Sequence, residues 1–171
     1  MWLAKIGKLG LLRDLFGEVL ISEETYKEAV EKGLEGGFSD ALIIKEACEQ
    51  GWIKVKSLDE KQVATCQKIL QNTFELHLGE AQAIVLARGI SKKTLLLMDD
   101  SSGRAFAEAS GLKVRGVLHV VMTAVWKKLL TSEEAKETLL ALIQKGFRIE
   151  PKLLARVLQE IDNILERRVS T

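Results

Sequence analysis

Four carboxylates in this sequence stand out by their positions: Asp99, Asp100, Glu28 and Glu80. Asp99 and Asp100 directly follow the apolar run 95–98, which lacks polar alternation and so indicates a strand buried on both faces. Ligands of parallel sheets lie at the carboxyl ends of the strands, where two adjacent acids are unfavourable unless a cation or a proton neutralises them. Glu28 falls in a predicted helix, and Glu80 in the first turn of another.

Each of these acids also has an ordinary structural explanation. Acids in a first helical turn are favoured by the helix dipole, and Glu80 fits that position. Most acids of a chain that is 29% charged lie in solvent, which would explain Glu28 equally well. Residue type and spacing alone therefore do not decide whether Glu28, Glu80 and the Asp99–Asp100 pair have a functional role or a purely structural one.

The elements that must position these acids alternate between helices and short apolar strands. The pattern predicts strands at residues 18–21, 52–55, 95–98 and 112–115. It predicts helices at residues 2–16, 22–32, 39–50, 59–70, 79–89, 103–109, 117–130, 131–146 and 151–168. The expected helix caps are Ser22, Ser39 or Asp40, Ser101 or Ser102, and Thr131 or Ser132. This alternation predicts an α/β fold, with a doubly wound, mainly parallel sheet flanked by helices.

Composition indicates one soluble globular domain over residues 1–171. Hydrophobic residues make up 47%, and the formal net charge is +1, which excludes a strongly basic nucleic-acid-binding surface but not a local basic patch. Cys48 and Cys66 fall in predicted helices without metal-type spacing, so we expect free thiols in a reducing compartment. No apolar run reaches the length of a membrane span, and residues 1–12 lack a signal-peptide pattern, so we expect a cytoplasmic protein.

Three segments, in order, resemble PIN-domain proteins, and more narrowly a prokaryotic branch of small, largely uncharacterised PIN-like proteins. They are LAKIGKLGLLRDLFGEVLISEETYKEAV, LHLGEAQAI and LLLMDDSSGRAFAEASGLKVRGVL, and the resemblance runs from residue 3 to about residue 158. It implies a cluster of acids that binds Mg²⁺ or Mn²⁺ and hydrolyses RNA phosphodiester bonds. Such cations take oxygen ligands, and two of them can activate a water and neutralise the leaving oxygen.

Carried over to this sequence, the resemblance implies that Glu28 and Glu80 are metal ligands, together with Asp99 or Asp100. It also implies a central N-terminal strand that ends in a ligand Asp. In this branch that strand precedes the segment at residues 3–7, whereas the first acid here is Asp14. We therefore expect that the strand and one ligand are absent. Loss of the central strand would remove hydrogen-bond partners from two neighbouring strands. We therefore expect a homo-oligomer in which another chain supplies the pairing.

The leading functional prediction is a metal-dependent endoribonuclease, with the toxin half of a toxin–antitoxin pair as the usual role that the resemblance implies. Lys92, Lys93, Arg104 and Arg115 surround the acidic pair in sequence and are candidates for RNA phosphate contacts, although a solvated basic rim would explain them too. The first alternative is a non-catalytic PIN-like interaction module. Gln82, Ser101 and Ser102 stand where relatives often carry acids or polar groups, which favours that alternative.

A third alternative is a receiver or hydrolase domain that transfers phosphate. Such domains need an acid pair early in the chain or a glycine-rich phosphate loop, and the sequence contains neither. The sequence therefore disfavours this class.

Overall fold

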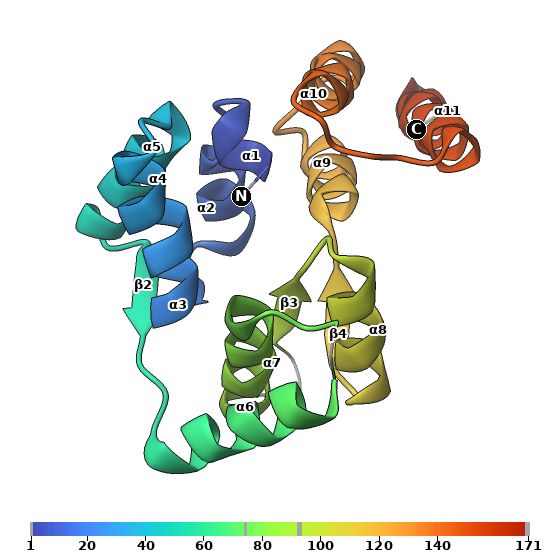
Figure 1. The fold of residues 1–171 in the computed structure, drawn as a ribbon. Helices are drawn as coiled ribbons and strands as arrows, with labels where there is room; N and C mark the ends of the chain where they lie inside the picture. Colours follow the sequence, from blue (N-terminus) through green and yellow to red (C-terminus); the bar gives the residue numbers. More distant parts are fainter. Residues whose placement is uncertain (1, 74, 92–93, 170–171) are drawn as a thin grey trace. The chain divides into compact units, whose positions relative to one another are not determined.

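A computed structural model describes residues 2–73, 75–91 and 94–169 (Figure 1). The chain divides into two compact units. Met1–Gly17 and Val117–Thr171 form the first unit, and Glu18–Gly116 forms the second. All four predicted acids belong to the second unit. None of the helices in the described ranges is long and apolar enough to cross a membrane.

The second unit contains four short parallel strands. β1 (Val19–Ser22) pairs with β2 (Ile53–Lys56), with Val19 opposite Ile53. β3 (Leu95–Leu97) pairs with β4 (Lys113–Arg115), with Leu95 opposite Lys113. Among the described residues each strand has one partner, so the strands form two two-stranded sheets. The predicted α/β class is confirmed, whereas a continuous doubly wound sheet stays a prediction.

A helical stretch follows β1 and passes through a π-turn. It consists of α3 (Glu23–Tyr26), the π-helix η1 (Lys27–Glu31) and α4 (Lys32–Glu35), so it extends past the predicted end at residue 32. The predicted cap is confirmed, because the Ser22 hydroxyl accepts a hydrogen bond from the Thr25 N–H at 3.2 Å.

The cap predicted for α5 (Ser39–Glu49) is wrong. The N-cap residue is Phe38, in the extended region, and no side chain caps the helix. The reason is geometric: the backbone turns at Gly37 with φ of 71°, so that Ser39 is already in the first turn and Asp40 follows it. A residue inside the helix no longer has the extended backbone of an N-cap.

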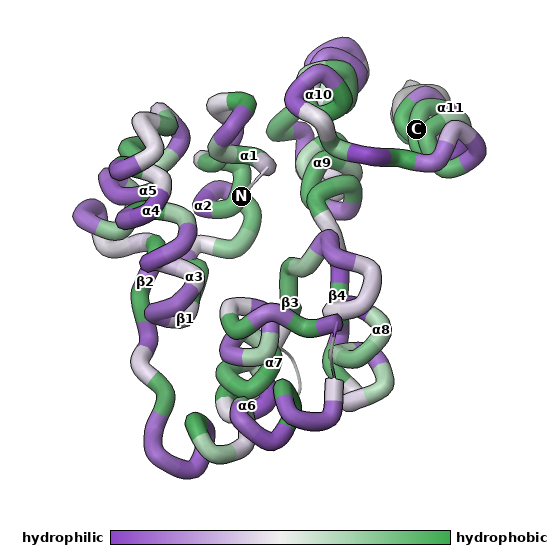
Figure 2. The backbone as a smooth tube through the Cα atoms, viewed as in Figure 1, coloured by the Kyte–Doolittle hydropathy of each residue, from purple (hydrophilic) through white to green (hydrophobic). Residues whose placement is uncertain are grey.

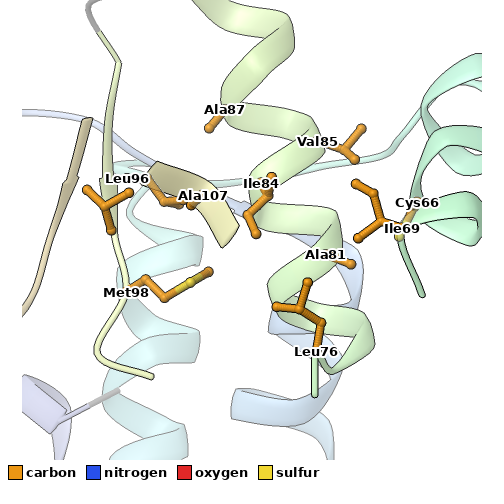
Figure 3. Close-up of a cluster of buried hydrophobic side chains, with 11 residues drawn as sticks. Cys66, Ile69, Leu76, Ala81, Ile84, Val85, Ala87, Leu96, Met98 and Ala107 are labelled. Carbon is orange, nitrogen blue, oxygen red and sulfur yellow. The ribbon is translucent and has the colours of Figure 1, made fainter. Parts of the chain in front are cut away.

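α6 (Glu60–Asn72) and α7 (Leu78–Ile90) pack with β3 and β4 around one apolar core. Figure 3 shows α7 between the α6 side chains of Cys66 and Ile69 and the side chains of Leu96 and Met98 on the other side. Ile84 is fully buried at the centre. The predicted free thiols are confirmed, since both cysteines are unpaired and Cys66 is buried.

The predicted βαβ unit is confirmed as β3, α8 (Ser101–Ala109) and β4. Its predicted cap is wrong, because Asp100 and not Ser101 or Ser102 is the N-cap residue. The Asp100 carboxylate accepts a hydrogen bond from the Gly103 N–H at 2.8 Å, so the helix begins earlier than expected and includes both serines. Gly111 follows the helix with φ of 79°, the left-handed conformation that was predicted.

The first unit is helical: α1 (Trp2–Lys5), α2 (Gly10–Phe16), α9 (Val117–Trp126), α10 (Ser132–Gln144) and α11 (Pro151–Val169). The continuous helix predicted at residues 2–16 is wrong, because Gly7 adopts φ of 68° and separates α1 from α2. Most of α9 is hydrophobic (Figure 2), and it ends at Trp126 rather than near residue 130. Thr131 caps α10 and forms a capping box with Glu134, so of the two predicted caps, Thr131 and Ser132, the first is confirmed.

Candidate metal centre

Glu80 is positioned by the first turn of α7. Its carboxylate accepts a hydrogen bond from the backbone N–H of His77, the N-cap residue, at 3.0 Å. A carboxylate at this place is favoured by the helix dipole and satisfies a backbone donor that the helix leaves unpaired. The side chain is half-buried, so it is held but still accessible.

Asp100 is the N-cap residue of α8, three residues before Gly103. The Asp100 carboxylate binds the Gly103 N–H, and the carboxyl carbon of Glu80 lies 3.5 Å from the point that a Cβ on Gly103 would occupy. Gly103 is buried, and a Cβ there would be crowded by Met98 Sδ at 2.5 Å but would be at ordinary contact distance from Glu80. Gly103 therefore lies near two of the predicted ligands, each of which makes a structural hydrogen bond.

Glu28 reaches the same end of α7 from η1. Its Oε2 atom lies 3.1 Å from the point that a Cβ on Gly79 would occupy, directly before Glu80. The π-turn that carries Glu28 contains one residue more per turn than an α-helix, and such turns often occur at functional sites. The exposed Glu28 side chain is thus placed next to the buried Gly79 backbone.

Asp99 lies against a third glycine. A Cβ on the buried Gly116 would collide with Asp99 Oδ1, and it would lie 3.0 Å from Arg104 Nη1. Asp99 is exposed after β3, and its carboxylate lies against Gly116, whereas that of Glu80 lies near Gly103. Gly79 and Gly116 therefore each leave room for one predicted acid, room that a Cβ would take away. Sequence analysis missed these glycines because a single glycine carries no signal of what approaches it.

The four acids do not form one compact set of ligands. Over the described ranges, no group of three or more His, Cys, Asp or Glu side chains is close enough to hold a metal ion. Glu28, Glu80 and Asp99 instead lie near three different glycines, and the carboxylates of Glu80 and Asp100 bind backbone N–H groups. Carboxylate oxygens are the donors that Mg²⁺ and Mn²⁺ prefer, so the chemistry of the residues fits such a cation.

Two further polar side chains lie at this site without having been predicted as ligands. Glu75 Oε2 accepts a hydrogen bond from the Ser102 hydroxyl at 3.0 Å, which places a fifth carboxylate beside α8. Gln82 Oε1 accepts a hydrogen bond from the Glu24 N–H at 3.3 Å and links α7 to the start of α3. Neither contact joins neighbours in sequence, so no local pattern could have indicated them.

The predicted RNA-contacting residues differ in their environments. Arg115 is exposed, and its Nη1 donates a hydrogen bond to the Val114 carbonyl at 2.7 Å. Arg104 is half-buried, and its guanidinium points to the Met98 carbonyl. Lys92 and Lys93 lie outside the described residues.

The comparisons with known proteins give one match. A family model, DUF3368, described as a PIN domain, matches residues 1–163. No curated protein and no solved structure matches the chain. The match covers both compact units and all four predicted acids.

Proposed function

Because the chain belongs to the PIN-domain family, we propose that it is a Mg²⁺- or Mn²⁺-dependent endoribonuclease. The observation that carries the proposal is that Glu80 and Asp100 both lie near Gly103, with Glu28 against Gly79, the residue before Glu80. Family membership supports the proposed reaction class, and the positions of these carboxylates support the proposed site.

The carboxylates of Glu80 and Asp100 would hold the cation, and Glu28 and Asp99 would join them as ligands by side-chain movement, because no three acids of the described residues lie close enough to share a metal ion. When bound, the cation would supply Lewis-acid activation of water and neutralise negative charge on the phosphate. The hydrogen bonds from His77 N–H and Gly103 N–H orient the two carboxylates before any metal binds. The N-termini of α7 and α8 add a positive potential that favours an anionic phosphate.

Cleavage of RNA in the presence of Mn²⁺ tests this function. Glu80→Gln and Asp100→Asn remove the charges but keep an oxygen that can accept each backbone hydrogen bond, so we expect folded proteins with at least 100-fold lower cleavage. Glu133→Gln is the matched control, because Glu133 is an exposed acid in the first turn of α10 and lies in the other unit. Unchanged cleavage in both site variants would refute the assignment.

A non-catalytic interaction module is the second candidate, and the hydrogen-bonded state of the acids favours it. Glu80 and Asp100 both act as helix-terminal acceptors, and Gln82 binds a backbone N–H rather than offering a charge. Calorimetry with Mn²⁺ distinguishes the candidates. For a ribonuclease, the heat of Mn²⁺ binding should fall when Glu80 or Asp100 is substituted. For an interaction module, the substitutions should leave the heat unchanged.

We also propose three partners: RNA as substrate, a second copy of the chain, and an antitoxin protein that inhibits the nuclease. Self-association is supported by the described strands, each of which has one strand partner and therefore one unpaired edge. The free thiols of Cys48 and Cys66 are consistent with the reducing cytoplasm that we propose as the location. Light scattering after size-exclusion chromatography tests the oligomer, and a monomer would refute it.

A further inference from the structure

We propose that Arg104 is a positioning residue, which fixes Asp99 and the end of β3 rather than contacting RNA. The inference rests on the proposed nuclease function, because Asp99 is one of its acidic ligands. It assigns a role inside the protein to a side chain that sequence analysis placed among the phosphate contacts.

The first support is the hydrogen bond between Arg104 and the backbone that precedes Asp99. Arg104 Nη1 donates to the Met98 carbonyl at 3.4 Å, and the Met98 N–H donates to the Arg115 carbonyl at 2.8 Å. The peptide groups on both sides of Met98 are therefore held, one by a side chain of α8 and one by β4. Asp99 is the next residue, so its backbone starts from a fixed position.

The second support is the close approach of Asp99 and Arg104 to Gly116. Asp99 Oδ1 and Arg104 Nη1 both lie within contact distance of the place that a Cβ on Gly116 would occupy. A positive guanidinium and a carboxylate that flank the same buried backbone attract each other. The position of Asp99 therefore depends on the charge of Arg104 and on the absence of a side chain at Gly116.

The third support is that acceptors in the protein occupy both ends of the guanidinium. Arg104 Nη2 lies 3.7 Å from Glu108 Oε1, one turn along α8, while Nη1 binds the Met98 carbonyl. The side chain is 35% exposed. An RNA phosphate would have to displace these contacts, whereas the exposed Arg115 can bind a phosphate without losing a carboxylate partner.

Amide hydrogen exchange in metal-free protein is the direct test, with Arg104→Gln compared with Arg115→Gln. We expect that R104Q increases the exchange rates of the amides of residues 99–103 by at least tenfold, and that R115Q does not. Equal exchange in R104Q and wild type would overturn the proposal. This measurement needs neither metal nor cleavage, so it decides the role of Arg104 even if wild type binds no Mn²⁺ and the proposed nuclease function fails.

Binding measurements separate positioning from RNA contact. We expect R104Q to weaken Mn²⁺ binding by about 10-fold, the usual effect of losing a residue that supports a ligand. The salt dependence of binding to a fluorescent single-stranded RNA, measured in EDTA, should stay unchanged in R104Q. A phosphate contact would instead lower the slope of log K against log salt by about 0.7, and that result would overturn the proposal.

Two further variants test the proposal independently of whether R104Q folds. Arg104→Lys keeps the charge but not the planar fork, so we expect exchange rates between those of wild type and R104Q. Gly116→Ala puts a methyl group where Asp99 and Arg104 meet, so we expect it to reproduce the exchange increase of R104Q while leaving Arg104 in place. Wild-type exchange in Gly116→Ala would contradict the proposal.

Discussion

The carboxyl carbon of Glu80 lies 3.5 Å from the point at which Gly103 would carry a Cβ. Gly103 also donates its N–H to Asp100, so one residue without a side chain separates two acids from different elements. Glu28 at Gly79 and Asp99 at Gly116 lie closer still, each as the one acid beside its glycine. The spacing of the acidic site is thus set by the positions of glycines as much as by the acids themselves.

Gly103→Ala should destabilise the protein and reduce cleavage together. The new methyl would lie 2.5 Å from Met98 Sδ, and Met98 is 8% exposed within the core, so it cannot move freely. Overpacking of this kind costs roughly 1–3 kcal/mol. Urea unfolding measures the loss. Gly10→Ala is the matched control, because a Cβ there meets nothing within 4 Å, and equal stabilities for the two variants would contradict the prediction.

Gly79→Ala should weaken metal binding without lowering the stability of the protein. Alanine is favoured over glycine in a helix by up to ~1 kcal/mol, so thermal stability should hold or rise. The methyl would lie 3.1 Å from Glu28 Oε2 and would displace that exposed carboxylate, so Mn²⁺ affinity should fall several-fold. In a double-mutant cycle with Glu28→Gln, the effects of the two substitutions on Mn²⁺ affinity should be non-additive. Full additivity would show that Glu28 and Gly79 act independently.

Asp100→Ala should cost about 1 kcal/mol of unfolding free energy, because it removes the N-cap of α8. Asp100→Asn should cost little, since asparagine caps helices about as well as aspartate. The predicted difference between the two variants is measured by chemical denaturation. Ser101→Ala is the control, because Ser101 is exposed inside the first turn; a cost equal to that of Asp100→Ala would mean that Ser101 supplies the cap.

Thr131→Ala should make the stability of the first unit less dependent on acid pH. Hydrogen bonds from the backbone N–H and hydroxyl of Thr131 lower the pKa of Glu134 below its usual 4.5. A carboxyl whose pKa is depressed in the folded state stabilises the protein above its unfolded pKa, and this contribution is lost as the pH falls through the folded value. The variant keeps the backbone hydrogen bond and loses those of the hydroxyl, so only part of the lowering of the pKa of Glu134 disappears. Wild type should therefore exceed the variant in Tm by about 2–4 °C at pH 7, with the difference shrinking below pH 4.5.

Thermal scans between pH 2.5 and 7 check this prediction. Ser39→Ala serves as a comparison, since Ser39 makes no capping hydrogen bond in α5. A Tm difference between wild type and Thr131→Ala that stays constant with pH would mean that Glu134 does not contribute through Thr131.

The sequence by itself determined the local elements whose causes lie within a few residues. Ser22 caps its helix because its hydroxyl reaches an N–H three residues ahead, and Gly111 closes α8 because glycine tolerates a left-handed backbone. The apolar run before Asp99 forms a strand, and the strand predicted at residues 112–115 pairs with it in parallel. The α/β class follows from this order of elements, whereas the family rests on the resemblance of three segments, and both are confirmed.

The tertiary structure alone decided which distant groups meet. Short-range patterns could not show that Gly7 breaks the first helix, because a glycine in an amphipathic helix is only mildly unfavourable. They could not show that Asp100 rather than a serine caps α8, since all three residues are good caps. The approach of Glu28 to Gly79 and the turn of Arg104 toward Met98 depend on packing between elements, for which the sequence carries no local signal.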